Sequence, residues 1–270
     1  MSGNSSRKTR FLKEHPYCCF CGGTRAATTL DHVPPKACFP RDLWPEESEF
    51  PCNLCNNGTS KHDTIFGYYS MRLDFNEDNR TPADIERQRK LRHEIAKRYP
   101  DALPDSEEPI FRVGHIITPS PVAVSVDTKP AVREAMRATG DKLAHALFYR
   151  EMKRILNADH KFFASMYQLQ RAGTEDLTTF FKRLLPDRRI SNRSNIKKYG
   201  NRFAYMSGCK PNEDFFVFAA QFGYGLVCWG MVLGNGMQVD NSNDALKKMN
   251  WRTGGCGLGS QSSGKTPDGA

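Results

Sequence analysis

The stretch "DHVPPKACFPRDLWPEESEFPCNLCNNGTSKHD", residues 31–63, combines an acid-histidine pair, a CxxC motif and an asparagine pair. Five prolines interrupt it, so the stretch cannot form one helix. Proline-rich segments of this kind are typical of irregular loops. The residues in it that can carry chemistry are Asp31, His32, Cys52, Cys55 and Asn56.

A second CxxC motif, Cys18 to Cys21, precedes this stretch, and thirty residues separate the two motifs. Each motif turns two thiolates toward one point, and four thiolates in a tetrahedron are a ligand set that zinc prefers. Cys19 is the less favoured ligand because its spacing to Cys21 is cramped, and Cys38 is expected to be a small buried residue. We therefore predict a structural zinc site made of Cys18, Cys21, Cys52 and Cys55.

Length and composition describe an ordinary soluble chain. Its 270 residues, 39% of them hydrophobic, can bury an adequate core, and no apolar run is long enough for a membrane span. The polar, basic N-terminus lacks the apolar middle of a secretory signal, so we expect a cytoplasmic protein with reduced thiols. The net charge of +9 favours an anionic partner such as nucleic acid, although many basic proteins bind no polyanion.

A zinc ion closed by four thiolates has no open position for water, so catalysis would need a second metal with oxygen ligands. Asp31 offers a carboxylate and Asn56 an amide oxygen, and both suit magnesium or manganese. His32 should point to the other side of an extended backbone, where it could accept a proton from water. Alone, an Asp-His pair indicates only a turn; its position between two cysteine motifs favours a site.

In the combination of "CCFCGG", "LDHVPP" and "PCNLCNNGTSK", the chain resembles the HNH nucleases, which have the ββα-metal fold. The resemblance covers roughly residues 15–70. It implies that Asp31 binds a divalent cation, that His32 is the general base, and that Asn56 completes the metal site. It further implies that the substrate is DNA, or RNA, and that a helix starts at the second CxxC motif.

The sequence departs from the family pattern in two places, one before the second CxxC motif and one after it. Members usually carry an asparagine before the second CxxC motif, which orients the base histidine, and "PEESEF" stands there in this chain. Glu47, Asn53 or a backbone carbonyl would then have to orient His32. Downstream, His62 and Asp63 lie about two helical turns after Asn56, and each is either a ligand or phosphate contact, or a solvated helix residue.

The predicted fold class is α+β, with a small zinc-stabilised ββα-metal (HNH) module followed by a mixed α+β domain. The expected order is the module in residues 1–75, a connecting helix and linker in 76–109, the mixed domain in 110–252 and a disordered tail in 253–270. Thr81 should cap the connecting helix and Pro100 should end it.

Within the mixed domain, hydrophobic periodicity predicts both strands and helices. Strands are expected over 110–118, 121–128, 203–208, 214–222 and 224–233. Helices are expected from a cap at Asp141 through 142–156 to Asn157, over 160–171, and over 174–185.

Basic residues offer candidate contacts to a phosphate backbone. Residues 182–202 carry eight lysines and arginines against one acid, and this segment is either a nucleic-acid contact or a solvated loop. Lys61 and Arg41 either bind a neighbouring phosphate or are plain surface charges. The C-terminal domain could also bind a second copy of the chain or a partner protein.

Two other functions compete with a nuclease. The first is a zinc-stabilised nucleic-acid-binding module with the same cysteines and no turnover. The second places the activity in the C-terminal region, but no metal, nucleophile or phosphate-loop motif supports it there.

Charge reversal of Arg188, Arg189, Lys197 and Lys198 tests the basic segment. We expect weaker DNA binding and a flatter dependence of affinity on salt, because each lost phosphate contact reduces the logarithmic slope by about 1. Fluorescence anisotropy over a salt series measures this slope. An unaltered slope would reject the segment as a DNA-binding surface.

Overall fold

The computed structural model describes residues 3–40, 49–53, 55–73, 80–104, 123–125, 129–169, 191–192, 202–210, 215–223, 225–235 and 251–254. The helices are α1 (Gly3–Glu14), α2 (Cys55–Arg72), α3 (Pro82–Arg98) and α4 (Pro130–Met152), with short 3-10 turns η1 (Cys19–Cys21), η2 (Lys36–Cys38) and η4 (Pro100–Ala102). The strands are β1 (Thr29–His32), β2 (Glu49–Cys52), β3 (Ala123–Ser125), β4 (Lys161–Leu169), β5 (Ser191–Asn192), β6 (Phe203–Lys210), β7 (Phe215–Phe222), β8 (Leu226–Leu233) and β9 (Arg252–Thr253). The predicted α+β class is confirmed.

The larger sheet is antiparallel, with the order β3-β4-β8-β7-β6-β5. At the start of β4, β9 pairs with the edge of β4 opposite to β8. Strands β6, β7 and β8 lie where the hydrophobic alternation predicts them. In β7 both faces are covered: Phe216 and Phe218 belong to the main core, whereas Phe215 and Val217 pack in a second cluster on the opposite face. A strand buried on both sides reads as a continuous apolar run, which is how this segment appears in the sequence.

The predicted helix over residues 160–171 is wrong, because β4 occupies this segment. Phe162 and Ala164 are buried in the main core, whereas Phe163 packs edge-on against Trp229 on the other face. This alternation has the period of two that a strand requires. Its aromatic residues also pair well with β8, since Phe163 lies opposite Met231.

The helix predicted to begin after a cap at Asp141 begins twelve residues earlier, at Pro130, and ends at Met152, before Asn157. Pro130 suits a first helical position. Asp141 is no cap: it lies inside the helix, is 6% exposed, and its Oδ1 lies 2.6 Å from Nη2 of Arg252 in β9. The carboxylate is therefore paired in charge with a distant arginine, a contact that local sequence does not reveal.

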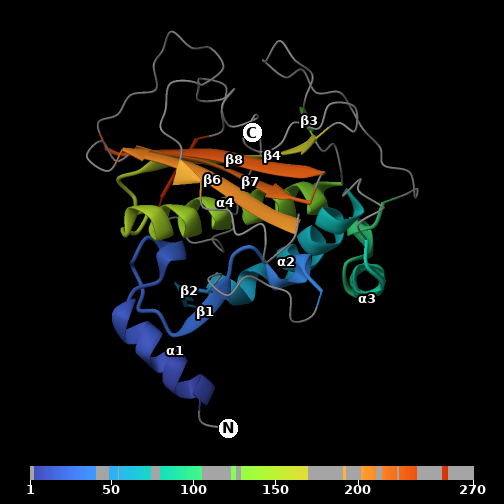
Figure 1. The fold of residues 1–270 in the computed structure, drawn as a ribbon, viewed down its shortest axis with the longest axis horizontal. Coiled ribbons are helices and arrows are strands. Elements are labelled where there is room, and N and C mark those ends of the chain that lie inside the picture. Colours follow the sequence, from blue (N-terminus) through green and yellow to red (C-terminus); the bar gives the residue numbers. More distant parts are fainter. Residues whose placement is uncertain are drawn as a thin grey trace, which may run out of the picture.

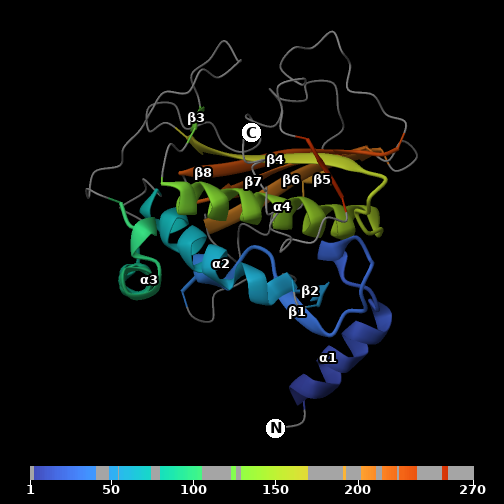
Figure 2. The same ribbon diagram turned by 180° about the vertical axis from the view of Figure 1, so that it is seen from behind.

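Helix α4 lies between the large sheet and the N-terminal elements, as Figures 1 and 2 show from opposite sides. One face of α4 packs on β4 and β8, and another face packs on α2. Small residues such as Ala135, Gly140 and Ala144 let both neighbours approach closely. A helix covered in this way is buried almost all round.

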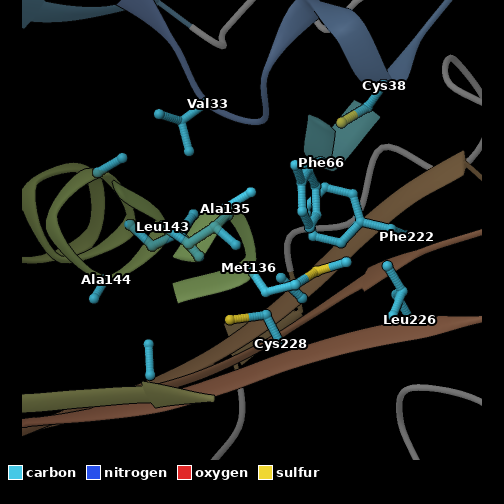
Figure 3. Packing of buried hydrophobic residues seen from close by; sticks show 14 of the residues in the cluster. Val33, Cys38, Phe66, Ala135, Met136, Leu143, Ala144, Phe222, Leu226 and Cys228 are labelled. Atoms are coloured by element: carbon cyan, nitrogen blue, oxygen red, sulfur yellow. The ribbon is translucent and has the colours of Figure 1, made fainter. Parts of the chain in front are cut away.

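The buried side chains form one main cluster that extends from Cys18 to Val232. Phe66 of α2 meets Phe222 of β7 edge-to-face, with ring centroids 4.9 Å apart. Figure 3 shows Val33 and Phe66 on one side of α4 and Cys228 on the other, with Met136 of α4 between. The N-terminal elements and the large sheet thus share one core.

Helix α3 confirms the predicted cap and its limits. Thr81 and Asp84 form a reciprocal capping box, Pro82 occupies the first turn, and the helix ends before Pro100. Asp84 also pairs with Arg202, which precedes β6.

Several expectations lie outside the described residues. They are the strand over 110–118, most of the strand over 121–128, the helix over 174–185, most of the basic segment 182–202 and the tail beyond residue 254. No helix in the part of the chain that the structure describes has the length and apolarity to cross a membrane.

Gly67 of α2 controls how closely this helix approaches the loop that follows β1. A Cβ added there would lie 2.5 Å from Cβ of Ala37 and 2.7 Å from its carbonyl carbon. We expect Gly67→Ala to lower the free energy of unfolding by about 1–3 kcal/mol, because backbone must move to accommodate the methyl group. Urea denaturation measures the change.

Gly140→Ala in α4 is the matched control, since both glycines are helical and gain the same propensity on substitution. Its nearest neighbour would be Cβ of Ala164 at 3.3 Å, so we expect a much smaller change. Equal stability of the two variants would contradict the close packing at Gly67.

Candidate active site and metal centre

The antiparallel pairing of β1 with β2 determines where the predicted catalytic pair lies. Asp31 lies opposite Phe50, and His32 lies opposite Glu49. Successive residues of a strand point to opposite faces. Asp31 is buried, whereas His32 is half-buried, so the two side chains have different surroundings.

Helix α2 begins at Cys55, within the second CxxC motif, as the resemblance implies. The side chains of residues 54–58 lie outside the described part, so the structure places neither the thiol of Cys55 nor the amide of Asn56. The next turns contribute Thr59 and Asp63, which share a helix face four residues apart.

A buried lysine of α4 meets both carboxylates. Nζ of Lys142 lies 2.9 Å from Oδ2 of Asp31, and 3.1 and 3.0 Å from Oδ1 and Oδ2 of Asp63. It also donates to Oγ1 of Thr59 at 3.3 Å. The other oxygen of Asp31, Oδ1, accepts the backbone N–H of His32 at 2.7 Å. Lys142 is completely buried, so this cluster is an ionic link inside the protein.

The charges in this cluster are unequal. Burial alone would lower the pKa of Lys142, but Asp63 and Asp31 raise it above its ordinary value, so the ammonium stays charged. Burial raises the pKa of Asp63 to about 6; Lys142 opposes this rise and Asp31 adds to it. With both carboxylates ionised, the cluster carries one excess negative charge, and Asp63 is the carboxylate whose ionised form is disfavoured.

His32 has the electrostatics of a neutral base. Burial lowers its pKa to about 4, and Lys36 acts in the same direction, while Glu49 and Asp31 act against it. The imidazole is therefore neutral near pH 7, with one nitrogen available to accept a proton.

Glu49 is the described side chain that faces the His32 ring. Oε1 of Glu49 lies 3.6 Å from Nε2 of His32, which is longer than a hydrogen bond but within ion-pair distance. Its Oε2 accepts a hydrogen bond from Arg7 at 2.9 Å. Of the groups that the sequence suggests for this task, Asn53 instead donates to the carbonyl of Ala26, and Glu47 lies outside the described residues.

Three of the four predicted zinc ligands can be placed. Cys18, Cys21 and Cys52 are buried, and η1 packs against β2, which brings the first motif near the second. Gly22 follows the first motif with a φ of 67°, the left-handed turn that glycine adopts without strain. None of the cysteines that the structure describes forms a disulfide.

These thiols have the donor chemistry that zinc takes, but the site is not assembled in the described residues. The described residues contain no group of three or more His, Cys, Asp or Glu side chains placed to hold a metal ion. The four-cysteine zinc site therefore remains a prediction. Cys38 is buried as expected, and burial raises the pKa of its thiol to about 12.

The remaining predicted residues divide into two groups. Lys61 is partly exposed on α2, with Nζ 5.6 Å from the ring centroid of Tyr99, and Nε2 of His62 lies 3.6 Å from Oε1 of Glu134. Arg41, Arg188, Arg189, Lys197 and Lys198 lie outside the described residues.

Sequence reasoning missed Lys142 and Glu49. A signal existed for Lys142, because the residues four positions before and after it, Ala138 and Ala146, are apolar, and a lysine on an apolar helix face requires a buried counter-charge. The register of the β1–β2 hairpin would have placed Glu49 opposite His32. The sequence does not predict this register, because of the loop between the two strands.

Comparison with known protein families, with curated proteins and with solved structures found no match to this chain.

Replacement of Lys142 tests the ionic link. Lys142→Met leaves two buried carboxylates without their cation, and we expect the free energy of unfolding to fall by about 3–5 kcal/mol. Asp63→Asn removes the excess negative charge and keeps an oxygen for Lys142, so we expect a change within about 1 kcal/mol. Urea denaturation at neutral pH measures both.

Lys61→Met is the matched control, because it removes the same charge from a partly exposed position and costs less than about 1 kcal/mol. A Lys142→Met variant as stable as Lys61→Met would show that the link does not form in solution.

Proposed function

We propose that the chain is an HNH-type endonuclease that hydrolyses phosphodiester bonds, with DNA as its main substrate. One observation supports this proposal best: the β1–β2 hairpin holds a buried carboxylate, Asp31, and on the next residue a half-buried neutral imidazole, His32, against the helix α2. The order of two antiparallel strands and a helix that starts at the second CxxC motif agrees with the ββα arrangement that the resemblance implies.

In this proposal His32 removes a proton from the attacking water. A proton on Nε2, which faces Glu49, leaves the lone pair on Nδ1 as the base. The distance of 3.6 Å to Glu49 would shorten when the ring becomes positively charged during proton transfer. Glu49 therefore has the role that an asparagine has in the family.

Asp31 and Asn56 are the residues that would hold a divalent cation in this site, magnesium or manganese. Such a cation would neutralise charge on the phosphate and on the leaving 3′ oxygen. The carboxylate of Asp31 is held in position from two directions, by the N–H of His32 and by Lys142.

The cysteines have a structural role in this proposal. Cys18, Cys21, Cys52 and Cys55 would bind zinc and hold η1 against β2, beside the hairpin that carries Asp31 and His32. The net charge of +9 and the partly exposed Lys61 would favour approach of a nucleic-acid backbone.

One observation favours the second candidate, a nucleic-acid-binding module without turnover. Lys142 already neutralises Asp31, as expected for a carboxylate that has a structural role and binds no metal ion. The two functions differ in the consequence of losing His32.

We expect His32→Ala to reduce cleavage of supercoiled plasmid by about 10²–10⁴-fold in magnesium or manganese, because the loss of a general base costs a factor of this size. Gel electrophoresis measures cleavage, and metal analysis with circular dichroism should report unchanged zinc content and fold. His93→Ala, an exposed histidine of α3, should cleave like the wild type.

Cleavage by His32→Ala at the wild-type rate would reject His32 as the base. A wild-type protein that binds DNA but leaves every DNA and RNA substrate intact with each divalent ion would favour the binding module.

A further inference from the structure

The ammonium of Lys142 has the surroundings of a bound cation. Four oxygens from Asp31, Thr59 and Asp63 lie 2.9–3.3 Å from its nitrogen. They come from two different elements, β1 and α2, while the lysine comes from a third, α4. Oxygen atoms of this kind are also the ligands of magnesium, manganese and calcium.

The dimensions of this oxygen cage fit an ammonium ion. Magnesium requires oxygens at about 2.0–2.1 Å and calcium at about 2.3–2.6 Å, so a divalent ion at this point would have to draw the oxygens inward. The net charge, in contrast, favours a divalent ion, because two carboxylates face a single positive charge. The cage is thus electrostatically suited to a divalent ion but geometrically filled by a side chain.

Lys142 cannot move into water without a rearrangement of the fold. The residue is completely buried in a helix that is covered by α2 and by the sheet. Its neighbour Asp141 is held by Arg252, and Leu143 is fully buried in the core. The ammonium is therefore a permanent part of the site.

We propose that Lys142 is the built-in cation of this site and keeps divalent ions away from Asp31 and Asp63 in the free protein. At close range a positive charge in a poorly solvated pocket strongly repels an incoming divalent ion. Removal of this charge should convert the oxygen cage into a divalent-cation site. The inference rests on the nuclease site proposed above: the catalytic ion would reach Asp31 only together with the substrate phosphate and would bind beside Lys142, whereas the free protein would exclude it, so its test requires no turnover.

The test is manganese binding to the full-length protein, measured by electron paramagnetic resonance of the free ion. We expect Lys142→Met to bind one more Mn²⁺ ion than the wild type does. The dissociation constant of this ion should be at least about ten-fold lower than that of any wild-type site that depends on Asp31. Adding Asp31→Asn or Asp63→Asn to Lys142→Met should abolish the gain. Lys97→Met, which loses the same charge at an exposed position of α3, should bind like the wild type.

The melting temperature with and without Mn²⁺ is a second measurement, which can also be made on a destabilised variant. Mn²⁺ should raise the melting temperature of Lys142→Met and leave that of the wild type nearly unchanged, because a ligand stabilises only the state that binds it. Lys142→Asn offers an independent variant, since its shorter side chain removes the charge and adds an amide oxygen. We expect the same gain of Mn²⁺ binding from it.

Tight Mn²⁺ binding by the wild type that Asp31→Asn abolishes would overturn the proposal, as would the failure of both Lys142 variants to gain a site. The nuclease proposal fails independently. An inactive wild type together with a Lys142→Met variant that binds Mn²⁺ would refute the nuclease and support the built-in cation.

Discussion

The ion pair between Lys142 and two carboxylates is the interaction on which the arrangement of the N-terminal half depends. A charge removed from water must be compensated nearby, so β1, α2 and α4 have to remain within hydrogen-bond distance of one another. Apolar contacts such as that between Phe66 and Phe222 supply attraction but tolerate some sliding. An ammonium ion among four oxygens tolerates little, which makes this link the best candidate for what sets the position of α4 across α2.

Helix α4 joins the two parts of the molecule because its two faces carry different polar anchors. Asp141 reaches the sheet side through Arg252, whereas the next residue, Lys142, reaches the hairpin and α2. Before and after these two residues, the helix carries small and apolar side chains that fill the core on both sides. The hairpin that carries Asp31 and His32 is therefore supported from behind by the same helix that covers the large sheet.

Sequence reasoning predicted the parts of this fold that short-range patterns define. The cap at Thr81 and strands β6 to β8 follow from capping residues, turns and alternation, whereas the start of α2 at Cys55 was implied by the resemblance to the HNH nucleases. It failed where distant residues decide: Asp141 resembles a helix cap until Arg252 is seen beside it, and the aromatic run of β4 resembles a helix until its two faces are assigned. The candidate site follows the same rule, since the Asp-His pair is local, whereas Lys142 comes from another element.

The ionic link also bears on the order in which the chain acquires its structure. Asp63 and Lys142 are 79 residues apart, and synthesis at about 5–20 residues per second would separate their appearance by several seconds. During that interval the hairpin and α2 lack both their counter-charge and the apolar surface of α4. The N-terminal elements are thus expected to settle only after the long helix has left the ribosome, so that folding of the histidine-bearing hairpin is a late event in the life of the nascent protein.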